Sequence, residues 1–178
     1  MNALSLTFIP VIAVFLGAAA AMLRKPGPAF VSAMQHLAAG VVFAAAATEV
    51  LPSVLHGSSP IATFSGGAIG VAVMLLLKSL EGRATGRMAF LVATGIDIFI
   101  DGLVLGLSFL AGDQAGLLLT VALTLEVLFL GLTVAVELQA SAYTKLRIAM
   151  TIGLVGLLLP LGALVAMPVG RLAPEMVV

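Results

Sequence analysis

The chain of 178 residues contains no cysteine and no tryptophan, and only 9% of its residues are charged. Without cysteine there can be no disulfide framework, no thiolate metal site and no dithiol redox pair. Eight basic residues balance eight acidic ones, so no net positive charge favours nucleic acid as a partner. Apolar side chains make up 62% of the sequence, against about 45–50% in an ordinary soluble domain. A water-soluble globule is therefore excluded, because its exposed surface would have to be mostly apolar.

Six apolar runs have about the 20 residues that an α-helix needs to cross a hydrocarbon core roughly 30 Å thick. They lack the alternating pattern of outer-membrane barrel strands and are about twice as long as such strands. Short charged or Pro/Gly/Ser-rich connectors separate the runs, which leaves no room for a soluble domain. We therefore predict an all-α fold in which residues 1–178 form one polytopic membrane domain. Its six transmembrane helices are expected at about 3–23, 31–54, 61–80, 88–111, 115–137 and 146–168.

Lysine and arginine are distributed unequally between the connectors. One side holds Arg24, Lys25, Lys78, Arg83, Arg87, Lys145 and Arg147, whereas the other side holds only Arg171. The positive-inside rule then places both termini outside the cytoplasm. We expect a multi-pass protein of the cell membrane, in particular of a bacterial inner membrane.

Small residues recur at helical spacing in several spans. Gly66 and Gly70 lie four residues apart in the third span, and Gly102 and Gly106 do so in the fourth. Such spacing is typical of helices whose backbones pack closely in a membrane, and we expect close packing at both pairs.

Three acidic residues lie near the middle of apolar spans, where charge is costly. Asp97 and Asp101 belong to the fourth span and Glu126 to the fifth. An acid at the bilayer centre costs about 2.5–3.5 kcal/mol, so the three cost on the order of 8–10 kcal/mol before their repulsion is counted. Asp97 and Asp101 are four residues apart and project from the same helix face.

No span carries a basic residue in its interior, so the counter-charge must be a proton or a bound cation. Protonated acids that only form hydrogen bonds between helices are one possibility. A divalent cation satisfies the acids better, because carboxylates from two helices supply the hard oxygen ligands that it prefers. Candidate auxiliary oxygens are Thr94, Thr124 and Ser108, although such hydroxyls often bond to their own helix backbone.

At these residues the sequence resembles the ZIP family of divalent-metal transporters. The fourth and fifth helices of that family each carry a His-Asn-x-Pro-Glu-Gly type motif whose first and fifth residues bind metal. Here the fourth span reads Asp97-Ile-Phe-Ile-Asp101-Gly102 and the fifth reads Glu126-Val-Leu-Phe-Leu130-Gly131. The resemblance implies that Asp97, Asp101 and Glu126 occupy ligand positions and that Leu130 occupies the fourth.

The second span ends in Glu49-Val-Leu-Pro52, which is similar to the His-Leu-x-Pro ending of the second ZIP helix. Glu49 therefore stands where that family often has a histidine near the outer mouth of the pathway; a solvated helix end is the alternative reading. The chain departs from the family in lacking pathway histidines and in having Ile100 and Phe129 at the motif prolines. ZIP proteins are bundles of eight helices, so the resemblance implies a ZIP-like bundle that lacks the last two helices.

The resemblance implies a transporter for a divalent metal ion such as zinc, iron or manganese, bound by Asp97, Asp101, Glu126 and Glu49. An all-oxygen site favours Mn²⁺, Fe²⁺ or Mg²⁺ over Zn²⁺. The expected partners are the metal ion, the lipid bilayer and a second copy of the chain in a homodimer. A proton relay, a carrier for an organic cation, or a structural or regulatory subunit that does not transport remain alternatives. We do not expect an enzyme, because no nucleophile is paired with a base and no histidine lies near the acids.

Overall fold

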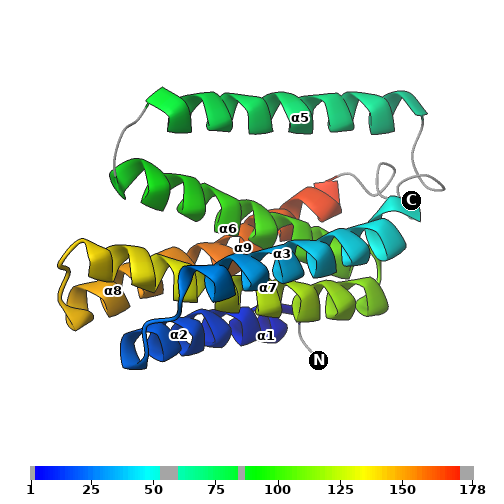
Figure 1. Cartoon of the computed structure of the whole chain (residues 1–178). Coiled ribbons are helices and arrows are strands. Elements are labelled where there is room, and N and C mark those ends of the chain that lie inside the picture. Colours follow the sequence, from blue (N-terminus) through cyan, green and yellow to red (C-terminus); the bar gives the residue numbers. More distant parts are fainter. Residues whose placement is uncertain (1–2, 53–59, 84–86, 173–178) are drawn as a thin grey trace.

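The computed structural model describes residues 3–52, 60–83 and 87–172, and within these ranges the chain forms helices and no strands. Helices occupy each of the six ranges expected from the sequence (Figure 1). They are α1 (Ala3–Leu6), α2 (Phe8–Leu23), α3 (Pro28–Ala45) with the π-helix η1 (Ala46–Val50), α5 (Pro60–Arg83), α6 (Arg87–Ala111), α7 (Asp113–Ala140), α8 (Lys145–Gly156) and α9 (Leu158–Leu172).

Four helical stretches in the described ranges are long and apolar enough to cross a membrane. They are Pro28–Thr48, Met88–Leu110, Asp113–Ala140 and Lys145–Pro168. Two further apolar helices, Phe8–Leu23 and Thr63–Leu76, are shorter. The described residues are thus all-helical, and the chain is a multi-pass membrane protein, as its composition predicts.

Two prolines explain why the first and last spans are each divided into two helices. Proline has no backbone N–H and cannot bond to the carbonyl four residues earlier. Pro10 leaves the carbonyl of Leu6 without its helical partner, and α1 ends at Leu6. Pro160 does the same to Gly156, where α8 ends. In both spans the helix resumes after a single residue, so the chain direction is kept.

Glycines bring α2 and α7 into backbone contact. A methyl group on Gly17 would overlap the carbonyl oxygen of Leu128, and one on Gly131 would overlap the carbonyl oxygen of Val14. The two glycines thus pack reciprocally, each against the other helix. Only glycine allows this approach, because any Cβ atom would push the helices apart.

A second reciprocal pair joins α6 to α9. A methyl group on Gly102 would overlap the carbonyl oxygen of Leu159, and one on Gly162 would overlap that of Phe99. Gly106 adds a further close approach, since its Cβ would lie 2.6 Å from the Cβ of Ala166. Close packing at Gly102 and Gly106 is therefore confirmed.

The same expectation was wrong for the third span. No atom of the described residues lies within 4 Å of the Cβ positions of Gly66 and Gly70. Every large hydrophobic side chain described on α5 is exposed, and α5 contacts the remaining helices mainly through α6. Figure 1 shows α5 running along one edge, apart from the other helices. Glycine spacing permits close packing, but it does not supply the partner helix.

The helix α7 lies at the centre of the bundle and contacts α2, α3, α6 and α8. Its side chains Val127, Ala135 and Leu138 are fully buried, as are Ile98 of α6 and Leu159 of α9. The core thus lies among α2, α6, α7, α8 and α9. Of the described side chains of α3, only Ala38 is buried, so this helix packs on the outside of that unit.

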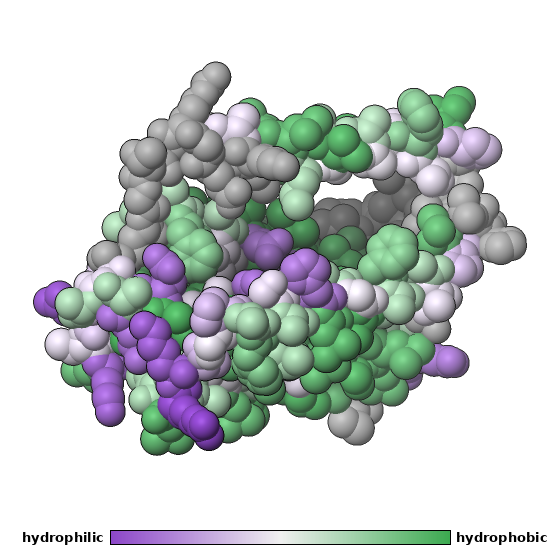
Figure 2. Space-filling model, in the orientation of Figure 1, coloured by the Kyte–Doolittle hydropathy of each residue, from purple (hydrophilic) through white to green (hydrophobic). Residues whose placement is uncertain are grey.

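The two ends of the bundle differ in charge. The connector between α2 and α3 contains Arg24 and Lys25, and the first turn of α8 contains Lys145 and Arg147; all four side chains are exposed. We call this end of the bundle the basic end. The space-filling view shows a mostly hydrophobic surface with hydrophilic groups gathered at this end (Figure 2). The start of α1 and the end of α9 lie at the opposite end (Figure 1).

Candidate metal centre

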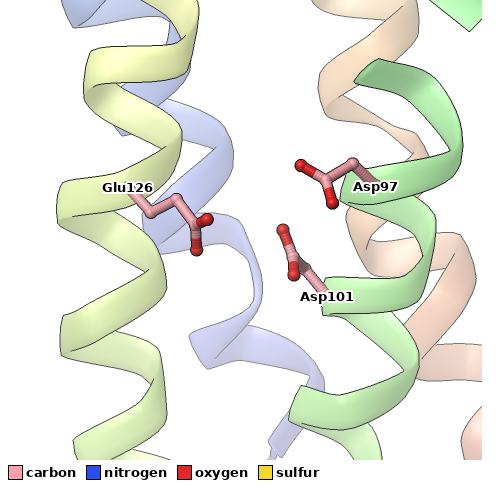
Figure 3. A group of neighbouring side chains, drawn as sticks. All are labelled: Asp97, Asp101 and Glu126. Atoms are coloured by element: carbon pink, nitrogen blue, oxygen red, sulfur yellow. The ribbon is translucent and has the colours of Figure 1, made fainter. Parts of the chain in front are cut away.

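The two aspartates of α6 lie at the middle of that helix and share one face. Four residues correspond to 400° of helical rotation, so Asp101 lies about 40° around the helix from Asp97 and one turn along it. Gly102 lies about 100° farther around and packs against α9. The contact with α9 therefore fixes the rotation of α6 and turns both acids away from α9. Figure 3 shows them pointing toward α7.

Glu126 lies at the middle of α7, on the side that faces α6 (Figure 3). Its neighbour Val127 is fully buried, and Gly131 packs against α2. The reciprocal glycine contact with α2 thus sets the rotation of α7, as the contact with α9 sets that of α6. Two glycine-supported helices therefore present their acids to each other.

The three side chains form one cluster, which we call the acid trio. One carboxylate oxygen from each of Asp97, Asp101 and Glu126 can be chosen so that all three atoms lie within 4.8 Å of one another. Oxygen ligands of a divalent cation lie about 2.0–2.6 Å from it, so two ligands on opposite sides of one ion are about 4–5 Å apart. The spacing of the acid trio therefore suits a single ion.

Two oxygens of the acid trio lack hydrogen-bond partners. Oδ2 of Asp101 and Oε2 of Glu126 are both buried, and neither receives a hydrogen bond from any described residue. A buried carboxylate oxygen without a partner is destabilising, since it has lost water and gained nothing in return. Asp97 is the most accessible of the three side chains, being exposed whereas the other two are half-buried. The cluster therefore has a buried side and an open side.

The candidate auxiliary hydroxyls differ in what they do. Ser108 donates to the carbonyl oxygen of Val104 at 2.8 Å, and Thr124 donates to that of Thr120 at 2.6 Å. Both hydroxyls thus bond to their own helix one turn back, as polar residues in membrane helices often do. Thr94 is buried, and its side chain lines a cavity beside Glu126.

A cavity of about 210 Å³ adjoins the acid trio between α3, α6 and α7. Glu126 forms part of its wall, together with the polar residues Gln35, Thr94 and Thr133. Gln35 Nε2 donates to Oγ1 of Thr133 at 3.3 Å, which links α3 to α7. Sequence reasoning missed Gln35, although an amide within an apolar span was a usable signal.

The sequence-predicted site residues are brought together in part. Asp97, Asp101 and Glu126 form one cluster, whereas Glu49 belongs to another helical segment, η1. The side chain of Glu49 lies outside the described part of the structure. Its backbone is π-helical, a local form that is frequent at functional sites. Leu130, at the fourth motif position, lines the cavity and offers no ligand atom.

The helices around the acid trio are continuous. Each of α6 and α7 is a single α-helix through its acidic residues, over 25 and 28 residues respectively. With Ile100 and Phe129 in place of proline, no backbone carbonyl is freed near the acids, and side chains must supply the ligands. Compared with models of protein families and with curated proteins, the chain matches none.

Proposed function

We propose that the chain transports a divalent metal ion across the membrane and that the ion binds to Asp97, Asp101 and Glu126. The observation that carries this proposal is the close approach of the three carboxylates, within 4.8 Å, with one buried oxygen each on Asp101 and Glu126 lacking a partner. Neither α6 nor α7 has a lysine, arginine or histidine near its middle that could neutralise them. A cation held between the two helices removes the repulsion and satisfies both oxygens.

The ligand chemistry favours a hard cation. Carboxylate and hydroxyl oxygens suit Mn²⁺, Fe²⁺ and Mg²⁺, while the residues of the site offer neither imidazole nor thiolate. Zinc accepts carboxylates as well, so it remains among the substrates to be tested. The ion is the cargo, and the proposal involves no resident metal.

The packing supports a division of the protein into a rigid unit and a peripheral one. Reciprocal glycine contacts lock α2 to α7 and α6 to α9, whereas α3 and α5 lie outside and bury few side chains. We propose that the unit containing α2, α6, α7, α8 and α9 rocks against α3 and α5, so that the acid trio opens to one side of the membrane at a time. Deprotonation of the acids permits binding, and protonation favours release.

We further propose that the chain is a relative of the ZIP transporters and that residues 1–178 contain six membrane spans. The support is the placement of Asp97, Asp101 and Glu126 at the ligand positions of the motifs. In this proposal the basic end faces the cytoplasm, both termini lie outside it, and the membrane is a bacterial inner membrane. A second copy of the chain covers the exposed side of α5 in a homodimer. Reporter fusions can test the orientation, and crosslinking can test the homodimer.

Binding and transport can be measured separately. Detergent-solubilised protein is heated with and without Mn²⁺, Zn²⁺ or Mg²⁺, and metal uptake is followed in proteoliposomes that contain a metal-sensitive dye. Wild type should be stabilised by at least one of these ions, and Asp97→Asn, Asp101→Asn and Glu126→Gln should each weaken that effect. Glu137→Gln is the matched control, since Glu137 is an exposed acid of the same helix α7, outside the acid trio.

Each outcome assigns the chain to one class. Uptake by wild type that is lost in the trio variants supports metal transport. Stabilisation by metal without uptake supports a metal-binding subunit that does not transport. An unchanged melting temperature with every ion rejects the metal site and leaves the proton relay or organic-cation carrier.

A further inference from the structure

The cavity beside Glu126 extends from the acid trio toward the basic end of the bundle. Its wall includes Phe90 and Thr94 of α6 and Thr133 of α7. Phe90 precedes Asp97 by seven residues, and Thr133 follows Glu126 by seven, which corresponds to about 10 Å along each helix. Because α6 begins only three residues before Phe90, the cavity covers most of the distance from the acids to that end.

Thr94 is a polar residue on the wall of this cavity. Its side chain is only 7% exposed and lines the cavity together with Gln35 and Thr133. Thr120 and Thr133 of α7 use their hydroxyl protons within their own helix, donating to carbonyls one turn earlier at 2.7 and 2.9 Å. Polar groups on the wall favour water or an ion in the space beside them.

Gln35 contributes an acceptor to the cavity wall. Its Nε2 donates to Thr133, whose own proton is used by the carbonyl of Phe129. The Oε1 atom of Gln35 is then left as an acceptor at the cavity wall. Gln35 and Ala39 are both exposed, so the cavity is open along α3.

The volume of the cavity suits a hydrated ion. A cavity needs about 10–15 Å³ to hold one water, and an octahedral shell has six waters. The cavity measures about 210 Å³. Ions such as Mg²⁺ lose their waters reluctantly and commonly keep several of them when bound to proteins. A chamber of this size with acceptors on its wall therefore lets water replace carboxylate ligands one at a time.

We propose that this cavity is a hydration vestibule, in which a divalent cation exchanges the carboxylates of the acid trio for water on its passage between the trio and the basic end. Thr94 and Gln35 hold the water shell, and Glu126 is the wall shared with the acid trio. This inference rests on the proposed function, because it needs a cation at the acid trio.

Cysteine accessibility tests the vestibule directly, since the chain has no cysteine of its own. Ala39→Cys places a thiol on the cavity wall, and Leu37→Cys places one at the same depth of α3 on an exposed apolar position outside the cavity. In proteoliposomes, a charged methanethiosulfonate should label Ala39→Cys at least 10-fold faster than Leu37→Cys. Saturating Mn²⁺ should slow the labelling of Ala39→Cys by at least 3-fold. Equal labelling of the two variants, or labelling indifferent to Mn²⁺ in protein that Mn²⁺ stabilises, overturns the vestibule.

A second measurement separates transport from binding. Thr94→Val with Gln35→Leu removes two polar groups of the cavity wall and leaves all three carboxylates. We expect Mn²⁺ uptake to fall about 10-fold while the Mn²⁺ concentration for half-maximal thermal stabilisation changes less than 3-fold. Thr120→Val is the matched control, because its hydroxyl is bonded to Gly116 and lies outside the cavity. Unchanged uptake by the double variant overturns the vestibule alone, whereas absence of Mn²⁺ stabilisation in wild type overturns the proposed function as well.

Discussion

Replacing Glu126 by glutamine should change the stability of the protein in opposite directions with and without metal. The substitution keeps the size of the side chain and removes one negative charge from the acid trio. It also supplies an amide N–H group that can donate to the unpartnered Oδ2 of Asp101. Without metal, the variant should therefore be more stable than wild type.

The size of this effect follows from the geometry. Two unit charges 4.8 Å apart repel by about 3.5 kcal/mol at an effective dielectric constant near 20. Glu126 is only half-buried, and a proton bound by the metal-free acid trio already removes part of this repulsion in wild type. We therefore expect a smaller gain in the stability of the metal-free variant, about 1–3 kcal/mol. At roughly 2–4 °C per kcal/mol, the melting temperature should rise by about 2–12 °C.

Metal should reverse the order of stability. At a free Mn²⁺ concentration 100 times the wild-type Kd, binding stabilises wild type by about 2.7 kcal/mol. If the variant binds about 100-fold more weakly, the same concentration stabilises it by only about 0.4 kcal/mol. Thermal unfolding in detergent with a Mn²⁺ titration measures both quantities, with Glu137→Gln as the control. A variant that is less stable than wild type without metal, yet responds equally to Mn²⁺, would show that Glu126 is structural and refute the reasoning.

Three further predictions concern packing, pH and orientation. Gly102→Ala should destabilise the protein by about 1–3 kcal/mol, since its methyl group overlaps the carbonyl oxygen of Leu159. Gly66→Ala should be neutral or stabilising by up to about 1 kcal/mol, because nothing described lies near its Cβ position. Thermal unfolding measures both effects, and equal losses of stability would contradict the packing. Mn²⁺ affinity should fall as the pH is lowered, because protons compete for the carboxylates, and Asp101→Asn should flatten this dependence; a titration slope identical to that of wild type would count against ligand protonation. A reporter enzyme that is active only outside the cytoplasm should be active when fused to the C-terminus, and activity confined to fusions in the connector between α2 and α3 would reverse the proposed orientation.

The sequence alone was sufficient for the class of the protein and for the relative placement of two of the three acids in the acid trio. Apolar composition excludes a soluble fold, and run length with proline and charge punctuation predicts where the helices lie. Helical periodicity also places Asp97 and Asp101 on one face, because a spacing of four residues fixes the angle between them within a single helix. All of these inferences depend on local geometry, which the order of residues determines.

The tertiary structure decided which faces meet. Helical periodicity does not specify that Glu126 approaches α6, which the sequence implied only through the need for a counter-charge and the motif resemblance. The glycine contacts of α7 with α2 and of α6 with α9 set the rotation of both helices. Packing between helices also explains why Gly102 contacts the backbone of another helix, whereas the Cβ position of Gly66 has no neighbour in the described structure. Thr94 and Thr124 likewise have the same side chain and similar distances in sequence from an acid, but Thr94 lines the cavity beside Glu126, whereas Thr124 donates to the carbonyl oxygen of Thr120. Periodicity fixes positions around one helix axis, whereas contacts between helices depend on the packing of the whole bundle.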